Sequence, residues 1–157
     1  LPAHLEQGIS FRVREITGPT LAPPTVEPLP PQLNIQRDAL MVSNLKPGSY
    51  RLTVDGEPVV TARHDAWSEG VAIDASPAHR EAEALRQAVN DKNLQFTYSW
   101  KALNQVHIVG ERKTSPSGQA LPGEVIEFKR MADQREEQLR DMLQLRSRQW
   151  RLERVAD

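Results

Sequence analysis

The chain contains no cysteine, few aromatic residues (5%) and no excess of charge of either sign. Without cysteine it can form no disulfide, no cysteine-ligated zinc site and no thiolate nucleophile. Its 20 Lys and Arg residues nearly balance its 21 Asp and Glu residues, whereas a dedicated nucleic-acid-binding protein normally carries a clear basic excess. No apolar run approaches the roughly 18 residues needed to span a bilayer. We therefore expect neither a nucleic acid nor a membrane among its partners.

The 157 residues suffice for one domain of ordinary size or for two small modules. The first residue is Leu1 instead of methionine, so we expect a processed product or a piece of a longer protein. Proline is concentrated in a lead-in over residues 1–37, which has one expected strand at Ile9–Val13. Because proline fixes φ and lacks a backbone donor, the rest of this lead-in is expected to be an extended linker. A small β module over 38–75 and a helical region over 76–157 complete the predicted division.

The β module shows the alternation of apolar and polar residues that is typical of strands. One strand is expected over 50–54 and a returning strand over 59–62. Asp55–Gly56 is expected to join them, because a type I′ hairpin turn needs positive φ at both central positions. The position of Tyr50 after a Pro-Gly turn also suits a tyrosine corner, in which the hydroxyl ties down the turn. Three or four strands are too few to close a β-sandwich. The apolar face of this sheet must therefore be covered by something else.

The apolar period becomes helical from Ser76 onward, with spacings of three, four and seven. Ser76 suits the N-cap of a helix and Pro77 suits its first position. We expect helices over 77–103 and 122–150, packed as an antiparallel hairpin or laid on a larger body. The predicted fold class is therefore α+β: a small antiparallel sheet of three to four strands, followed by two long helices, after a proline-rich N-terminal segment.

Neither a catalytic site nor a metal site is evident from the spacing of the polar residues. The four histidines are far apart, and none belongs to an HxxxH or HxH pair, so we assign no metal and no cofactor and expect ordinary surface or edge histidines. His64–Asp65 with Ser68 or Ser76 suggests a serine triad, yet neither serine is flanked by the glycines of a nucleophile turn. Ser76 is better explained as a helix cap, and no catalytic residue is assigned.

The stretch Asn90–Asn104 is the strongest candidate for a binding surface, because it combines three asparagines with Phe, Tyr and Trp. Aromatic rings stack on a polar ligand, and carboxamides fix its orientation. The alternative, which the periodicity favours, is that the rings belong to the core and the asparagines cap or bridge to a loop. The candidate substrate-binding residues, with Arg112 offered for an anionic group, are Asn93, Tyr98, Trp100, Asn104 and Arg112.

The C-terminal arginines at 146, 148, 151 and 154 form the one local basic excess. Helices often end in basic residues because these complement the helix dipole, and we prefer this interpretation. The other interpretation is an RNA or membrane-surface contact, which predicts binding that weakens steeply with salt.

Three runs of residues occur in a distinctive order. Leu40–Gly56 follows the pattern L-x-V-x-G-L-x-x-G-x-Y-x-L-x-I-D-G, with Asn44 where glycine is common. Gly70–Ile73 and Ser76–Pro77 come next, and Asn90–Lys113 is similar to N-x-K-N-x-x-F-x-Y-R-W-R-P-x-N and Y-I-x-G-x-R-K, with Ser and Lys flanking the tryptophan in place of arginine. This order resembles the region after the catalytic domain in many bacterial SGNH (GDSL-type) hydrolases.

The resemblance covers roughly residues 38–130 and implies the C-terminal part of such an enzyme, downstream of its catalytic domain. In that family a serine attacks an ester carbonyl and a histidine acts as the base. The G-D-S and D-x-x-H blocks that carry these roles do not occur in this chain. The resemblance therefore implies a non-catalytic accessory region of a serine esterase that acts on carbohydrate or lipid esters. Its expected partner is the upstream catalytic domain, and its expected location is periplasmic or secreted. The alternative is a non-enzymatic protein-interaction module.

Overall fold

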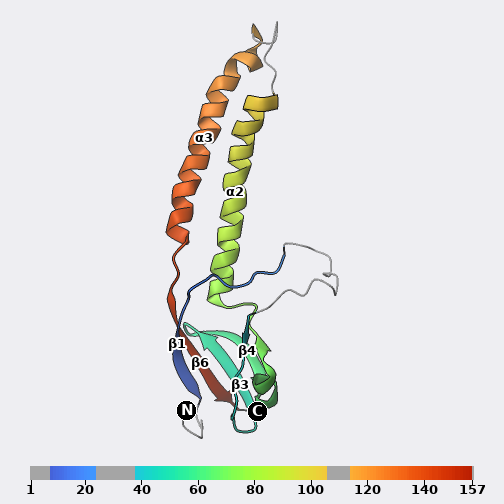
Figure 1. Cartoon of the computed structure of the whole chain (residues 1–157), viewed down its shortest axis with the longest axis vertical. Coiled ribbons are helices and arrows are strands. Elements are labelled where there is room, and N and C mark those ends of the chain that lie inside the picture. Colours follow the sequence, from blue (N-terminus) through green and yellow to red (C-terminus); the bar gives the residue numbers. More distant parts are fainter. Residues whose placement is uncertain (1–7, 24–37, 106–113, 157) are drawn as a thin grey trace. The chain divides into compact units, whose positions relative to one another are not determined.

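The computed structural model describes residues 8–23, 38–105 and 114–156, with the backbone alone for 100–105. Within these residues it contains six strands and three helices, so the predicted α+β fold class is confirmed (Figure 1). The chain divides into two compact units, one formed by Leu1–Glu83 with Leu145–Asp157 and the other by Ala84–Gln144. Most of the proline-rich lead-in, residues 1–7 and 24–37, lies outside the described residues.

The main sheet of the first unit has four antiparallel strands in the order β1-β6-β3-β4. The expected strand near the N-terminus is β1 (Ile9–Arg14), and it pairs with β6 (Ser147–Val155). The prediction of a helix reaching residue 150 was wrong, because residues 147–155 form an interior strand that has pairing partners along both edges.

A hairpin of β3 (Ser49–Val54) and β4 (Glu57–Arg63) completes the main sheet, as the sequence predicted. Its turn has φ values of 53° at Asp55 and 84° at Gly56, which explains the Asp-Gly pair. The predicted tyrosine corner is also present, since the Tyr50 hydroxyl donates to the Lys46 carbonyl at 3.1 Å.

The core of the first unit lies against one face of the main sheet. Helix α1 (His64–Glu69) brings Trp67 into it, where the indole Nε1 donates to the Ala62 carbonyl at 3.1 Å. A small antiparallel sheet, made of β2 (Ala39–Leu40) and β5 (Val71–Ala72), adds further apolar cover. The cover that the apolar face was expected to need is thus supplied within this unit. The buried core residues are Leu45, Tyr50, Leu52, Val54, Trp67, Ile73 and Leu152.

Helix α2 (Pro77–Gln105) begins in the first unit and continues into the second, which also contains α3 (Pro116–Met142). The two long helices pack against each other as an antiparallel pair, one of the two arrangements expected, because Lys92 pairs with Glu136 while the rings of Tyr98 and Phe128 lie 5.3 Å apart (Figure 1). Helix α3 starts earlier than expected, at the N-cap Ser115, whose hydroxyl accepts from the Gly118 amide at 3.1 Å. None of the helices in the described part of the chain is long and apolar enough to cross a membrane.

Candidate functional site

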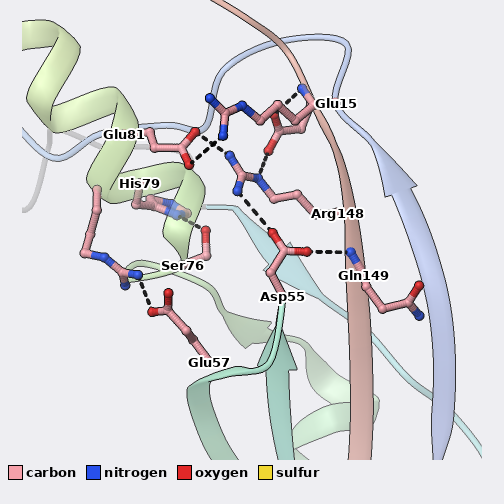
Figure 2. A network of polar contacts seen from close by, with 10 residues as sticks. Glu15, Asp55, Glu57, Ser76, His79, Glu81, Arg148 and Gln149 are labelled. Atoms are coloured by element: carbon pink, nitrogen blue, oxygen red, sulfur yellow. Dashed lines mark hydrogen bonds and ion pairs between the residues drawn. The ribbon is translucent and has the colours of Figure 1, made fainter. Parts of the chain in front are cut away.

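Arg148 is a buried cation that three carboxylates surround (Figure 2). It lies on β6 with its side chain only 5% exposed. Its Nη2 donates to Glu81 on α2 at 2.6 Å, and its Nη1 donates to Asp55 in the β3–β4 turn at 3.2 Å. Its Nε donates to Glu15, which directly follows β1. One side chain therefore connects four segments of the first unit.

The electrostatics of this network keep Arg148 charged. Burial alone lowers its pKa, but hydrogen bonds to Glu81 and Glu15 outweigh that effect, so the pKa of Arg148 is raised. The interpretation of the C-terminal arginines as a helix end was therefore wrong, because they lie on or beside a strand. Arg146 lies 3.8 Å from Glu81, and Arg154 donates to the Pro47 carbonyl at 2.8 Å.

A pocket of about 230 Å³ lies in the same unit and shares Glu15 with the network. Its wall is formed by residues 13–19 with Asp38, by Ile73, by the first turn of α2 and by Trp150. The apolar part of this wall comes mainly from Val13, Ile16, Pro19, Ile73 and the Trp150 ring.

Ser76, His79 and Asp38 are polar residues of the wall that bind one another, and Arg14, Glu15 and Thr17 also line the pocket. Ser76 precedes the first residue of α2, as predicted, and the Arg80 amide donates to its carbonyl at 3.2 Å. His79 lies three residues later, and its Nδ1 shares a hydrogen bond with the Ser76 hydroxyl at 2.8 Å (Figure 2). Its Nε2 lies 3.6 Å from the carboxylate of Asp38. Thr20 anchors that carboxylate through its amide and its hydroxyl, both at 3.1 Å.

This arrangement does not have the geometry of a serine triad. In a serine triad the base uses Nε2 toward the serine and Nδ1 toward the carboxylate, whereas His79 presents Nδ1 to Ser76 and Nε2 to Asp38. Ser76 is also only 2% exposed, so its hydroxyl has little access to a substrate. The expectation of a surface or edge histidine was wrong for His79, which is 7% exposed. The sequence did contain one sign of this contact: His79 follows Ser76 by three residues at the start of a helix, so the two side chains can meet within one turn.

Two polar atoms that belong to residues of this wall have no hydrogen-bond partner in the described part of the structure. They are His79 Nε2 and Trp150 Nε1, and both atoms are buried. Buried polar atoms in folded proteins nearly always have a partner. Among the described residues no cluster of His, Asp and Glu could hold a metal ion.

Of the five predicted substrate-binding residues, the structure describes the side chains of Asn93 and Tyr98. Asn93 is exposed, while Tyr98 is 44% exposed and packs on Phe128. Residues five apart point to different sides of a helix, so Asn93 and Tyr98 do not share one wall. Trp100 and Asn104 belong to α2, but their side chains lie outside the described part, as does all of Arg112. The site on this helix stays a prediction.

Comparison with known proteins gives a likeness of fold. No protein-family profile matches the chain, and no curated protein sequence matches it. A solved structure of BT4096, a gut microbial diltiazem-metabolizing enzyme, is similar, with a TM-score of 0.61 and 14% sequence identity. The similarity covers 94% of this chain and 43% of that chain. The chain therefore spans less than half the length of this enzyme.

Proposed function

We propose that this chain is the non-catalytic C-terminal part of an SGNH (GDSL-type) serine esterase, whose full-length form hydrolyses carbohydrate or lipid esters. The observation that carries the proposal is the similarity of almost the whole chain to under half of a larger enzyme. The Leu40–Gly56 run adds support, because Asn44 has a φ of 63° at the position where the SGNH pattern has glycine. Glycine and asparagine are the residues that adopt this left-handed conformation most readily.

The proposed partner is the upstream catalytic domain of the same protein, in the periplasm or outside the cell. Both units carry large apolar side chains that are open to solvent, as docking on a further body would require. They include Ile16 and Met41 in the first unit, and Leu94, Phe96, Ile126 and Leu143 in the second. The same exposed groups favour the second candidate function, a protein-interaction module with no catalytic parent.

A serine-directed fluorophosphonate probe tests the absence of a nucleophile in this chain. The parent protein is expected to react with the probe and to hydrolyse acetylated sugars, lipid esters or diltiazem. This chain alone is expected to do neither, because its candidate serine is buried and its hydroxyl is bound to His79 Nδ1. Labelling of Ser76 in the isolated chain would overturn the proposal. The Ser76→Ala variant, which removes the hydroxyl, serves as the control for such labelling.

The coding sequence upstream distinguishes the two candidate functions. The esterase proposal expects a G-D-S block there, followed by a D-x-x-H block, because these carry the nucleophile and the base in that family. An upstream sequence without both blocks contradicts the esterase and leaves the interaction module.

The α2 site can be tested in the full-length esterase by replacing Tyr98 and Asn104 with alanine. If these side chains contact substrate, kcat/KM falls while the binding of the catalytic domain is unchanged. Glu137→Ala, an exposed change on α3, is the matched control. Unchanged kcat and KM in both test variants would remove these residues from the substrate site.

A further inference from the structure

We propose that the pocket formed by residues 13–19, Asp38, the first turn of α2 and Trp150 binds an uncharged, hydroxyl-bearing small molecule of monosaccharide size. The proposal does not depend on the esterase assignment, because all of the groups that carry it belong to this chain. It starts from two buried atoms of wall residues that have no hydrogen-bond partner among the described residues: His79 Nε2, which lies 3.6 Å from Asp38, and Trp150 Nε1.

These two atoms define what the ligand must offer. The indole N–H of Trp150 can only donate, so it requires an acceptor. The His79 imidazole shares its Nδ1 with Ser76, which leaves Nε2 as a donor or an acceptor depending on the tautomer. A hydroxyl group both donates and accepts, so it matches Trp150 and either tautomer of His79.

Three charged residues line the pocket, Arg14, Glu15 and Asp38. Glu15 is already bound to Arg148 and Arg14 is exposed, so Asp38 is the charge beside His79 Nε2 that bears on the ligand. Its carboxylate lies 3.6 Å from His79 Nε2, so an anion that accepts from this nitrogen would lie against a negative charge. A cation that carries no acceptor group would suit Asp38 but would leave the Trp150 donor without an acceptor. A carboxylate oxygen has more than one lone-pair site, so Asp38 can accept from a ligand hydroxyl while it remains bound to Thr20. An uncharged polyol satisfies all three groups.

The size and the lining of the pocket agree with this class. A volume of about 230 Å³ is small beside the pockets that hold drug-sized molecules, which begin at roughly 300 Å³. The wall combines the Trp150 ring with aliphatic side chains of Val13 and Ile73. Apolar surface of this kind suits the C–H faces of a sugar ring, and the polar groups would bind its hydroxyls.

The indole N–H signals of the tryptophans provide a direct test in a 15N-labelled sample of this chain. We would titrate it with methyl α-glucopyranoside, methyl β-galactopyranoside, N-acetylglucosamine and xylose. Glucuronate, an anion, and glucosamine, a cation, serve as charged control ligands of the same size. The Trp150 signal, assigned with Trp150→Phe, is expected to shift and saturate with at least one neutral sugar. Trp67 is the internal control, because its Nε1 already donates to the Ala62 carbonyl.

Two substitutions test the contacts. Asp38→Asn is expected to weaken the binding of that sugar about tenfold, as the loss of one charge-assisted hydrogen bond does. Trp150→Phe keeps a ring but removes the donor, and a similar loss is expected by calorimetry. Asp141→Asn, an exposed change on α3, should leave the affinity unchanged. An unmoved Trp67 signal in each variant shows that the core is intact.

Three results would overturn the proposal. The first is the absence of a saturable Trp150 shift with every sugar tested, which would identify the pocket as a water site. The second is tighter binding of glucuronate or glucosamine than of the neutral sugars. The third is binding that Asp38→Asn leaves unchanged in a variant whose Trp67 signal is unmoved.

Discussion

Arg148 Nη2 lies 2.6 Å from Glu81 Oε2, and this contact joins the interior strand β6 to the start of α2, 67 residues earlier in the chain. The same guanidinium binds Glu15 and Asp55. A buried ion pair often adds little net stability, because desolvation of the charges opposes their attraction, yet its disruption leaves buried charge without a partner. We therefore expect the network to favour this arrangement of the strands more than it raises the free energy of unfolding.

The first prediction concerns Arg148→Met, which removes the positive charge and keeps much of the side-chain volume. The free energy of unfolding of the first unit is expected to fall by about 3 kcal/mol, because Glu15 and its neighbours lose their counter-charge. Urea denaturation followed by tryptophan fluorescence measures this, since Trp67 and Trp150 belong to this unit.

Arg151→Met is the matched control for this change. Arg151 lies on the same strand, and its side chain is 61% exposed beside Glu153. Surface ion pairs contribute little, so a loss below about 1 kcal/mol is expected. Arg148→Lys should fall between the two, because lysine keeps the charge but not the planar fork that reaches several carboxylates. Equal effects of Arg148→Met and Arg151→Met would contradict the structural role of the network.

The second prediction concerns the glycine that precedes β1. Gly8 has a φ of 115°, and a Cβ atom there would lie 2.2 Å from the Leu152 carbonyl oxygen. Gly8→Ala is therefore expected to destabilise the pairing of β1 with β6 by about 1–3 kcal/mol. Gly18→Ala is the control, since nothing lies within 4 Å of its Cβ position. Amide hydrogen exchange of β1 should rise in the first variant alone, and equal exchange in both would refute the prediction.

The third prediction concerns the tyrosine corner. Tyr50→Phe removes the hydroxyl that binds the Lys46 carbonyl in a fully buried position. A loss of about 1–2 kcal/mol is expected, because the partly buried Lys46 carbonyl loses the hydrogen bond from this hydroxyl. Tyr98→Phe makes the same chemical change at a residue that is 44% exposed, and a change within about 0.5 kcal/mol is expected there. Thermal or urea unfolding of both variants measures the loss in the free energy of unfolding. Equal losses in the two variants would mean that the tyrosine corner does not stabilise the fold.

The features that the sequence predicted well depend on neighbouring residues. Asp55 and Gly56 specify their turn through backbone preference, and the Tyr50 hydroxyl reaches a carbonyl only four residues away. Pro77 is the first residue of α2, as its fixed φ predicted. Such signals need no knowledge of the remaining fold, because steric limits and short hydrogen bonds act within one turn.

The features that the sequence did not predict depend on contacts between distant segments. Strand β6 has Trp150 and Leu152 at strand spacing, but basic residues surround them, and its partners come from the N-terminal half of the sequence. A short mixed pattern does not separate a helix end from such a strand. The burial of His79 has the same origin, because the wall around it combines residues 13–19 with α2 and β6.

The last prediction concerns the acid stability of the helical hairpin. The hydrogen bond from Lys92, together with its charge, lowers the pKa of Glu136 from the ordinary value of 4.5. A carboxyl group whose pKa is lower in the folded state stabilises that state fully above its unfolded pKa, and it loses this effect as the pH falls through the folded pKa. Glu136→Gln is therefore expected to lower the stability of the second unit near neutral pH.

The difference from the wild type should shrink once the pH falls below 4.5 and should vanish when Glu136 is protonated. Urea unfolding followed by far-UV circular dichroism at a series of pH values measures it. Glu137→Gln, an exposed neighbour on α3, is the control for the loss of one negative charge. Lys92→Met should remove the same pH-dependent difference, because the lowered pKa requires the ammonium group. A Glu136→Gln difference that stays constant across this range would mean that the Lys92–Glu136 pair does not contribute to the hairpin in solution.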